Sequence, residues 1–388
     1  MTLQHASEGN AHPIFRRCLE AFSQNLVEGE AGAACAIYHD GELVLDAWGG
    51  VADVRDGRPW SRDTAVPVFS VTKGVAALVL LQLADRGLIG LDQPVARYWP
   101  EFGVHGKERV TVREALAHRA GVPAISGEIT VEDLQDSATM ATRVAAETPV
   151  HEPGQAHIYH ALTIGWITSE LVQRATGKRL GAWLKDELCV PYHLNLGIGR
   201  RSHDQDVAYL ETPPEHDTPD VPADLLAARA ISLNGLIPPR VSGVAAALNQ
   251  IEFQRCELAG ANCIADARSL AKLYAGALGS IAGMEGLPSS RVDDALRVVS
   301  EGVQFSTAFP GPRWGTGVML PFAVQPMLGA GSFGHDGMGG SLAFAHAPSR
   351  TSFAYVRNRM AAPNVVDPLV YRVVNTLAEC LGLDFVKE

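Results

Sequence analysis

The sequence predicts an α+β protein in which one antiparallel sheet, built from both ends of the chain and flanked by helices, carries an inserted, mostly helical lobe. Two observations predict this class. Strand patterns accompany a helix near each terminus, whereas the middle of the chain has helical patterns joined by long loops. We expect residues 1–388 to form one unit, with about 1–75 and 320–388 in the sheet lobe and about 76–319 in the helical lobe.

Apolar runs bounded by turn residues predict the strands at the two ends. The N-terminal strands span 33–38 and 43–48 and are joined by the tight turn His39-Asp40-Gly41. The C-terminal strands span 342–346 and 352–356. Apolar residues at helical spacing predict the flanking helices, over 12–28 and about 366–381.

The middle of the chain carries signals for helix starts and stops. Thr111 and Glu114 form a capping box, which predicts a helix that begins there. A second helix is predicted over 162–174, and Gly177 closes it. Residues 205–245 are rich in Pro, Asp and Gly, so we expect a long irregular segment that forms a wall or lid of a pocket.

Composition narrows the class of partner. The chain is 47% hydrophobic and 19% charged, which indicates a globular protein, and its net charge of −11 argues against nucleic acid as a partner. The N-terminus lacks the basic and apolar regions of a signal peptide, and no stretch has the apolar length needed to span a bilayer. The six cysteines are scattered without a C-x-x-C pair, which suits a cytoplasmic protein without disulfides.

The stretch from Phe69 to Gly74 joins an apolar strand, predicted over 65–69, to a long apolar helix that Gly87 ends. Ser70 opens the first turn of this helix, and Lys73 follows three residues later on the same face. Lysine is scarce here, with six in the chain, and a desolvated lysine can lose its proton and act as a base. Ser70 and Lys73 are therefore a candidate nucleophile and its base, beside the free amides of a helix N-terminus.

A plain structural role for these residues stays open at this point, because serine is a favoured N-cap and a first-turn lysine often reaches solvent. The Ser-x-x-Lys pattern is also weak alone, since it recurs at Ser269 and Lys272. We interpret that second occurrence as chance: Asp266 caps the helix, so Ser269 lies within it, and no strand leads into it.

Four landmarks in order identify a family resemblance. They are Ser70-Val71-Thr72-Lys73, Leu116-Ala117-His118-Arg119-Ala120-Gly121, Pro153-Gly154 with Tyr159, and Gly334-His335-Asp336-Gly337 with Gly339-Gly340. The chain resembles the serine β-lactamase and penicillin-binding-protein superfamily and, within it, the family VIII carboxylesterases. The match covers most of the chain and implies a β-lactamase-like fold.

The resemblance implies roles for individual residues. Ser70 would be the acylated nucleophile, and Lys73 with Tyr159 would manage its proton. The backbone N–H groups of Ser70 and Met338 would form the oxyanion hole. We expect Lys73 to favour its neutral form and Tyr159 to ionise more readily than free tyrosine. Residues of the strand motif, His335, Asp336 and Gly337, would contact the substrate.

The chain departs from the β-lactamase pattern at two positions. Relatives have Asn where this chain has Ala161, and Lys where it has His335. Both missing groups would recognise the amide and carboxylate of a β-lactam, whereas the acyl-transfer residues are retained. Plainer roles also remain open here, since Tyr159 suits a helix start and His335 suits a core or strand-edge position.

A metal site is the competing use of the histidines near Tyr159. His151, Glu152, His157 and His160 are potential ligands, but Pro153-Gly154 interrupts the helical spacing that H-E-x-x-H requires, and Gln155 replaces its second histidine. We therefore expect no metal and no other cofactor. A G-x-S-x-G motif is also absent from the sequence, so an α/β-hydrolase triad is unsupported.

Together these patterns predict a cytoplasmic serine carboxylesterase that hydrolyses short-chain or small esters through an acyl-enzyme on Ser70. We expect a small-molecule ester as its substrate, with no nucleic acid and no membrane as partner, and the sequence leaves the oligomeric state open. The alternatives are a β-lactamase or D-amino-acid peptidase of the same fold, and a catalytically idle penicillin-binding-like protein.

Overall fold

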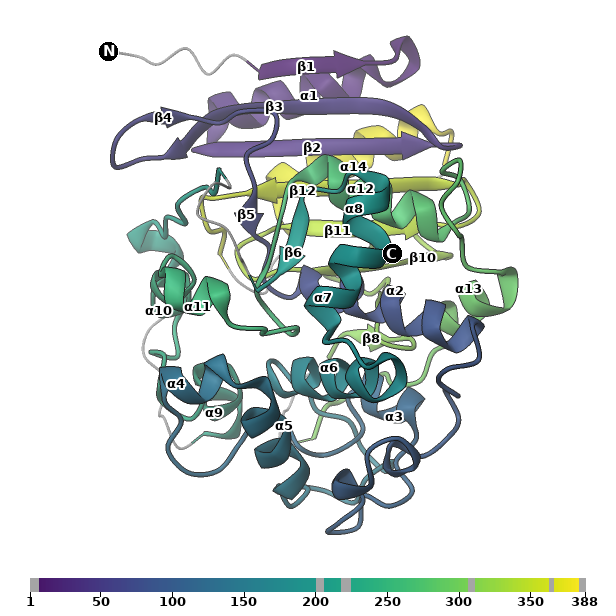
Figure 1. Cartoon of the computed structure of the whole chain (residues 1–388). Coiled ribbons are helices and arrows are strands. Elements are labelled where there is room, and N and C mark those ends of the chain that lie inside the picture. The colour runs from purple at the N-terminus through teal and green to yellow at the C-terminus, as the bar shows by residue number, and fades with distance from the viewer. Residues whose placement is uncertain (1–6, 200–205, 218–224, 306–310, 363–365, 384–388) are drawn as a thin grey trace.

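The computed structural model describes residues 7–199, 206–217, 225–305, 311–362 and 366–383. Its centre is a sheet of nine strands, in which eight follow the order β1-β3-β2-β12-β11-β10-β9-β8 and β4 pairs with β3 (Figure 1). All the pairings are antiparallel. The strands are β1 (Ser7–Ala11), β2 (Gly32–His39), β3 (Glu42–Asp53), β4 (Arg58–Pro59), β8 (Arg313–Trp314), β9 (Met319–Leu320), β10 (Ser332–Asp336), β11 (Leu342–His346) and β12 (Thr351–Arg357).

The sheet is built from both ends of the chain, as predicted. N-terminal strand β2 pairs with C-terminal strand β12 in continuous register, from His39 opposite Thr351 to Ala33 opposite Arg357. Successive side chains of a strand point to opposite faces, and β2 follows this rule: Ala33 packs in one hydrophobic core and Ala34 in the other. Both faces of the sheet are therefore covered.

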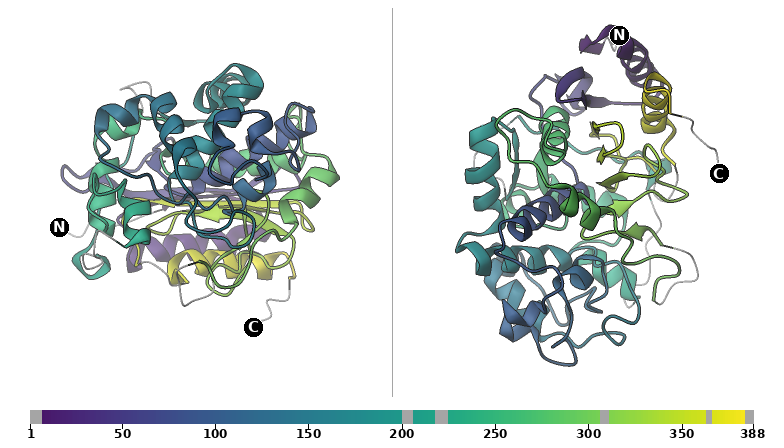
Figure 2. Two further views of the ribbon diagram at one scale, coloured as in Figure 1. Left: turned by 90° about the horizontal axis from the view of Figure 1, so that it is seen from below. Right: turned by 90° about the vertical axis from the view of Figure 1, so that its right-hand side faces the viewer.

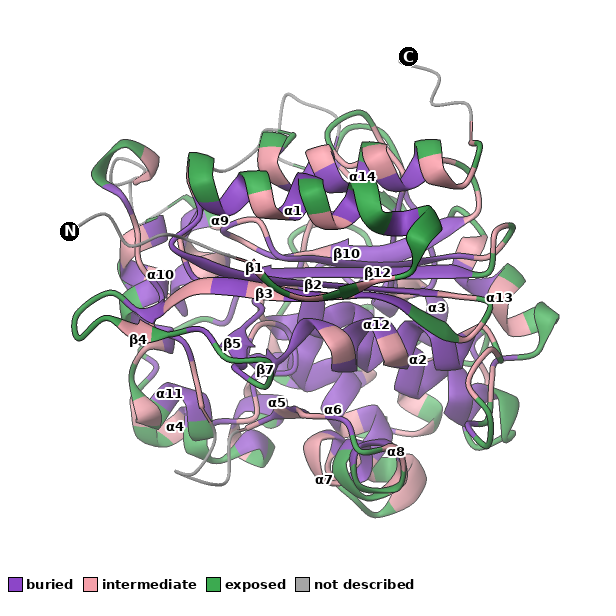
Figure 3. Ribbon diagram, turned by 90° about the horizontal axis from the view of Figure 1, so that it is seen from above, coloured by how far each residue is buried: buried purple, intermediate pink, exposed green. Residues whose placement is uncertain are grey.

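Helices cover both faces (Figure 2 and Figure 3). The terminal helices α1 (Arg16–Glu28) and α14 (Pro368–Cys380) pack on one face, close to the ranges predicted for them. The opposite face carries α2 (Val71–Asp85) and α12 (Ala267–Ala277). The sequence analysis placed α12 in the helical lobe, but its Ala271 carbonyl accepts a hydrogen bond from Ser352 of β12, at 2.7 Å.

The helices of the middle of the chain lie below α2 in Figure 1 or beside it. Its helices are α3 (Val112–Leu116), α4 (Val131–Gln135), α5 (Ser137–Ala146), α6 (Thr163–Thr176), α7 (Leu180–Leu184), α8 (Val190–Tyr192), α9 (Leu226–Ser232), α10 (Val241–Leu248), α11 (Ile251–Arg255) and α13 (Ser289–Leu296). Short 3-10 turns are η1 (Pro13–Phe15), η2 (Val95–Arg97), η3 (Pro100–Phe102) and η5 (Pro214–His216), and η4 (Lys185–Cys189) is a π-helical turn. The predicted Thr111 capping box and the Gly177 end of α6 are both present.

The structure corrects two predictions, one about the strand before Ser70 and one about the segment 205–245. The predicted strand over 65–69 is only the two residues of β5 (Val66–Pro67), in a small separate sheet with β7 (Cys263–Ala265) and β6 (Leu196–Ile198). Val68 N–H still donates to the Cys263 carbonyl, and the run ends at Phe69, whose φ of 50° turns the backbone out of the extended conformation. Within the predicted irregular segment 205–245, residues 205 and 218–224 lie outside the described residues, and α9 and the start of α10 interrupt the irregular backbone of the rest.

No helix among the described residues is long and apolar enough to cross a membrane. The same residues contain no group of three or more His, Cys, Asp and Glu side chains arranged to hold a metal ion.

Candidate active site

The start of α2 is held rigidly in the protein interior. Every residue from Val71 to Ala84 is buried, and α2 has no polar stripe (Figure 3). The preceding Phe69 is a non-glycine residue with φ of 50°, a sparsely populated conformation that the surrounding structure must enforce. Thr72 Oγ1 secures this turn, because it donates to the Phe69 carbonyl at 2.5 Å and accepts from the Cys263 N–H at 2.8 Å.

Ser70, Lys73 and Tyr159 meet at the N-terminus of α2. Ser70 Oγ lies 2.9 Å from Lys73 Nζ and 2.8 Å from the Tyr159 hydroxyl. Ser70 precedes the helix, and its side chain makes no capping hydrogen bond. The Ser70 side chain therefore does not serve as an N-cap of α2. The structure brings together the three side chains that the sequence analysis nominated as nucleophile, base and proton carrier.

Lys73 is buried and strongly desolvated. Its amine lies 2.7 Å from the Ala161 carbonyl and 2.7 Å from the Gly260 carbonyl, in addition to its contact with Ser70. Burial lowers the pKa of Lys73 to about 7, while the nearby Asp336 carboxylate acts in the opposite direction. The amine is thus about half neutral near pH 7 and mostly neutral above it, so the neutral form is far more accessible than in a solvated lysine, as expected from the sequence.

The prediction that Tyr159 ionises readily is wrong. Burial raises the pKa of Tyr159 well above that of free tyrosine; the hydrogen bond with Ser70 lowers it, and the charge of Asp336 raises it further. The physical reason is that burial disfavours the charged phenolate more than the hydrogen bond with Ser70 stabilises it. Tyr159 therefore keeps its proton and is a hydrogen-bond donor at this site.

Aromatic and histidine rings hold Tyr159 in place. The indole of Trp314 stacks on its ring with centroids 5.4 Å apart and planes at 10°, and His118 meets it edge-on at 4.9 Å. Burial keeps the pKa of His118 well below its ordinary value, so this imidazole is neutral. The Tyr159 backbone N–H also donates to Gln304 Oε1 at 2.9 Å.

The turn after β10 comes very close to the segment before Ser70. A Cβ atom at Gly337 would lie 2.3 Å from the Val68 carbonyl oxygen, so only glycine fits here. The turn is closed by hydrogen bonds from Gly337 N–H to the Ser341 carbonyl and from Gly340 N–H to the Gly337 carbonyl. Among the described residues, neither the Ser70 nor the Met338 N–H donates to a protein acceptor, which leaves both available to a ligand.

The strand residues His335 and Asp336 occupy different environments. His335 is only 1% exposed and lies against the rings of Trp314 and Tyr159, with Nδ1 2.6 Å from the Asp336 carbonyl. Burial lowers the pKa of His335, so it does not supply the fixed charge of a lysine. Burial tends to raise the pKa of Asp336, but hydrogen bonds from His335 and Gln325 hold it below its ordinary value.

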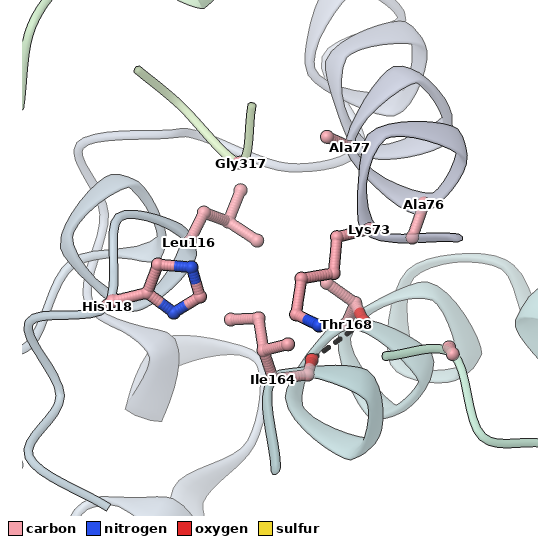
Figure 4. A pocket seen from close by; sticks show the side chains of 9 residues that line it. Lys73, Ala76, Ala77, Leu116, His118, Ile164, Thr168 and Gly317 are labelled. Carbon is pink, nitrogen blue, oxygen red and sulfur yellow. Dashed lines mark hydrogen bonds between the residues drawn. The ribbon is translucent and has the colours of Figure 1, made fainter. Parts of the chain in front are cut away.

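A small cavity lies on the inner side of Lys73 (Figure 4). Its volume is about 10 Å³, which is room for about one water molecule, and too little for an ester. Lys73, His118 and Thr168 supply its polar groups, and the remaining lining is Ala76, Ala77, Leu116, Ile164, Ala259 and Gly317. Ser70, Tyr159 and Met338 are each partly exposed, so a substrate reaches Ser70 from solvent and not through this cavity.

Sequence reasoning missed several parts of the site. The carbonyls of Ala161 and Gly260 hold Lys73, but any residue type presents a carbonyl, so no sequence signal marks them. Trp314 was not singled out, although the run Trp314-Gly315-Thr316-Gly317 is a distinctive local pattern. His118 was noted within a landmark but given no role. Ser269, the second Ser-x-x-Lys match, accepts a hydrogen bond from the Asn195 N–H inside the fold.

Two of the histidines considered as metal ligands contact backbone groups instead. His160 is fully buried; its Nε2 accepts from the Val122 N–H at 3.0 Å, and its Nδ1 contacts the Ile158 carbonyl at 2.6 Å. His151 contacts the carbonyl of Glu152 at 2.9 Å through Nδ1.

Comparison with known proteins extends this picture over the whole chain. The sequence profile of the family described as Beta-lactamase matches residues 15–376. The chain is 34% identical to "Esterase/beta-lactamase LipL" of Mycobacterium tuberculosis, over 92% of this chain and 84% of that protein. It is 28% identical to "Esterase EstB" of Burkholderia gladioli, over 84% of each.

Solved structures of other proteins have the same fold as this chain. A family VIII carboxylesterase superposes with a TM-score of 0.85 at 32% identity, covering 96% of this chain and 99% of the other. EstA from Arthrobacter nitroguajacolicus Rue61a superposes with a TM-score of 0.86 at 28% identity, covering 97% and 99%. The Ser70–Lys73–Tyr159 geometry, the fold and the profile match lead to one conclusion: this chain belongs to the Beta-lactamase family.

Proposed function

We propose that the protein is a serine carboxylesterase that hydrolyses short-chain or small esters through an acyl-enzyme on Ser70. One observation carries the proposal: Ser70 Oγ lies within hydrogen-bond distance of both a desolvated lysine, Lys73, and a protonated tyrosine, Tyr159. A nucleophile with a neutral base and a proton donor suits acyl transfer. The two relatives with "esterase" in their names support this reaction class.

The hydrogen-bond donors and acceptors around Lys73 support its role as the base. A neutral amine has two N–H groups and one lone pair, and the carbonyls of Ala161 and Gly260 can only accept. If the two N–H groups point at these carbonyls, the lone pair faces Ser70 Oγ at 2.9 Å. Ser70 then donates its proton to Lys73 and accepts one from the Tyr159 hydroxyl.

The reaction follows from this arrangement. Ser70 Oγ attacks the ester carbonyl carbon while its proton passes to Lys73, and the N–H groups of Ser70 and Met338 hold the oxyanion. The bond to the alcohol then breaks, and the alcohol oxygen takes a proton from the Lys73–Tyr159 pair. In the second half, water returns a proton to that pair as it attacks the acyl carbon, and Ser70 regains its own. This route requires no cofactor.

The same geometry disfavours β-lactams, the main alternative substrates. Ala161 offers no side-chain amide, and His335 is buried and neutral, so a substrate carboxylate finds no lysine at that position. Each lost charge-assisted hydrogen bond is worth roughly 1.5–3 kcal/mol. We expect kcat/KM for a short nitrophenyl ester to exceed that for a chromogenic cephalosporin by two or more orders of magnitude. A cephalosporin value equal to or above the ester value would identify a β-lactamase.

Covalent labelling tests the nucleophile. Wild-type protein treated with a fluorophosphonate, or quenched during turnover of a slow ester, should gain one adduct by intact-mass spectrometry, and peptide mapping should place it on Ser70. Ser70→Ala should lose the adduct and nearly all ester turnover. Ser269→Ala is the matched control in the second Ser-x-x-Lys sequence and should keep both. An adduct on Ser269 or Ser341 would refute the assignment.

We also propose that the protein works in the cytoplasm. All six cysteines are free in the structure, and five of them are buried, which suits a reducing compartment. Cell fractionation with an antibody against the protein would test this location, and recovery in the secreted fraction would contradict it.

A further inference from the structure

Lys73 extends from α2 toward the start of α6, where Ile164 and Thr168 lie (Figure 4). Its amine donates to the Gly260 carbonyl at 2.7 Å. Gly260 belongs to the segment between α11 and β7, and we call residues 256–262 the Gly260 loop. A carbonyl that fixes one N–H group of a neutral amine also helps to direct its lone pair. The groups that hold the Gly260 loop in place therefore also affect Lys73 as a base.

The side chain of Asn262 ties the Gly260 loop together. It is only 1% exposed, and its amide makes three hydrogen bonds with backbone groups. Nδ2 donates to the carbonyls of Phe253 at 2.9 Å and Cys256 at 2.6 Å, and Oδ1 accepts from the Leu258 N–H at 3.1 Å. One amide thus joins the end of α11 to the start, the middle and the end of the loop. Such an amide fixes the local backbone, because a buried polar group without a partner is costly.

Close backbone contact holds the Gly260 loop against the start of α6. A Cβ atom at Gly165 of α6 would lie 2.3 Å from the Gly260 backbone nitrogen. A Cβ atom at Gly260 would lie 3.1 Å from the Ala161 carbonyl oxygen, which is the other acceptor of Lys73. Side chains at these two glycines would separate the segments. Glycine at both positions therefore allows two backbone carbonyls to reach one amine.

The end of the Gly260 loop is also joined to the turn that carries Ser70. Asn262 forms a parallel β-bridge with Phe69, the residue before Ser70. The next residue, Cys263, donates its N–H to Thr72 Oγ1 at 2.8 Å. The nucleophile and the carbonyl that directs its base are thus held in one connected stretch of backbone.

We propose that Asn262 is a positioning residue for the base: by holding the Gly260 loop, it keeps the lone pair of Lys73 directed at Ser70. This inference rests on the serine esterase mechanism proposed above. Asn262 acts through the Gly260 carbonyl and is not itself a catalytic residue. If that carbonyl moves away, the amine is free to rotate, and an N–H group then replaces the lone pair in front of Ser70 Oγ.

Loss of the carbonyl also has an effect on the pKa of Lys73. A hydrogen bond from an ammonium group to a carbonyl is stronger than one from a neutral amine, so the Gly260 carbonyl favours the charged form of Lys73. Moving the carbonyl away removes this stabilisation and lowers the pKa of Lys73. Disturbing the Gly260 loop should therefore reduce the rate and move the pH midpoint downward together.

The charges around Lys73 stay in place when uncharged loop contacts are changed. Within the Gly260 loop, Glu257 accepts hydrogen bonds from Ser169 and Gly181, and burial raises the pKa of Cys256 to about 11, so its thiol is neutral. The other titratable groups that interact with Lys73 through charge or ring contact are Asp336, Tyr159, His118, His160 and His335. Replacing an asparagine or a glycine with alanine removes none of these groups, so a shifted midpoint reports the geometry of the loop.

The test is the pH dependence of Ser70 labelling by a fluorophosphonate, which requires the nucleophile and base but not the second half of the reaction. The wild-type labelling rate should have a midpoint near pH 7. Asn262→Ala should lower the rate above the midpoint at least tenfold and move the midpoint down by about half a pH unit or more.

Asn358→Ala is the matched control. Asn358 is 0% exposed, and its amide also makes three hydrogen bonds with backbone groups, which are those of Gly32, Val51 and Ala52. Its loss should reduce stability in the same way as the loss of Asn262, which urea titration would show, but should leave the midpoint of labelling near pH 7. An equal shift of the midpoint in Asn358→Ala would overturn the proposal.

A second variant moves the Gly260 carbonyl from the other side and decides the question if Asn262→Ala does not fold. Gly165→Ala places a Cβ atom against the Gly260 backbone nitrogen, so the rate and the midpoint should again fall. Gly243→Ala is its control, because a Cβ atom at this position of α10 would lie 2.5 Å from the Pro238 carbonyl oxygen, outside the Gly260 loop. A folded variant of Asn262 or Gly165 with an unchanged or higher midpoint would overturn the proposal, whatever its rate.

Failure of the proposed function gives a different result. Wild-type protein that gains no adduct on Ser70 at any pH would refute the esterase mechanism. Wild-type protein that labels on Ser70 with a midpoint near pH 7, together with an Asn262→Ala variant of the same midpoint, would refute the positioning role of Asn262 alone.

Discussion

Acidification below pH 7 should switch the enzyme off through one residue, Lys73. A lysine ordinarily has a pKa of 10.5, and burial lowers that of Lys73 to about 7. The neutral, basic form is therefore present above pH 7 and is lost as the pH falls through 7. We expect kcat/KM for a neutral ester to follow a single protonation, with a midpoint near pH 7 and a tenfold loss for each unit below pH 6.

The magnitude follows from burial. The difference between 10.5 and about 7 corresponds to roughly 5 kcal/mol, which the buried site imposes on the charged form of Lys73. At pH 7.5 about three quarters of the amine is then neutral, against about one part in a thousand for a solvated lysine. Desolvation thus increases the fraction of active enzyme by nearly three orders of magnitude at that pH.

The assay is kcat/KM for a neutral alkyl ester from pH 5 to 9, followed in a pH-stat at low substrate concentration, where the profile reports groups of the free enzyme. Circular dichroism at each pH controls for unfolding. Lys73→Arg keeps a cation but cannot act as a base, so it should be inactive at every pH in this range. A flat wild-type profile from pH 5.5 to 8, a midpoint near 10, or near-normal turnover by Lys73→Arg would each refute the reasoning.

Two further predictions concern charges around the site and the core. Asp336→Asn should move the midpoint of the pH profile to lower pH, because the Asp336 carboxylate raises the pKa of Lys73; an unchanged or higher midpoint would contradict this. Burial raises the pKa of Glu30 from 4.5 to about 7, so its stabilising contribution is complete below pH 4.5 and is lost as the pH rises through 7. The unfolding free energy of the wild type, relative to Glu30→Gln, should fall by up to about 3 kcal/mol over that interval in urea titrations, and a difference that rises with pH would contradict the assignment.

The sequence predicted the elements whose periodicity and boundaries are both visible in the local sequence. The hairpin of β2 and β3, the C-terminal strands β11 and β12 and the two terminal helices each have a period and a boundary in the sequence. β8 and β9 have two residues each, too few to show alternation. The amphipathic pattern of α12 indicates a buried face, but its packing partner is a sheet assembled from distant segments.

The site likewise contains residues that the sequence predicted and features that it did not. Ser70, Lys73 and Tyr159 were predicted because chemistry restricts which residue types can serve, and because the family resemblance implied these residues in this order. The carbonyls that hold Lys73 carry no residue-type signal, and the ionisation of Tyr159 depends above all on the burial of its own hydroxyl. Burial is a property of the three-dimensional structure, so the expectation for Tyr159 failed although its position beside Ser70 was predicted correctly.

The pairing of β2 with β12 has a consequence for how the enzyme is made. His39 and Thr351 face each other across the centre of the sheet, although 312 residues separate them. During synthesis from the N-terminus, the β2–β3 hairpin must wait with an open edge until almost the whole chain has emerged, while the helical lobe can fold earlier from local contacts. Ser70, Lys73 and Tyr159 are all translated well before the turn that carries Met338. Under the mechanism proposed above, a nascent chain would hold the nucleophile and its base yet lack the Met338 N–H, and we expect its hydrolytic activity to begin only when the C-terminal strands close the sheet.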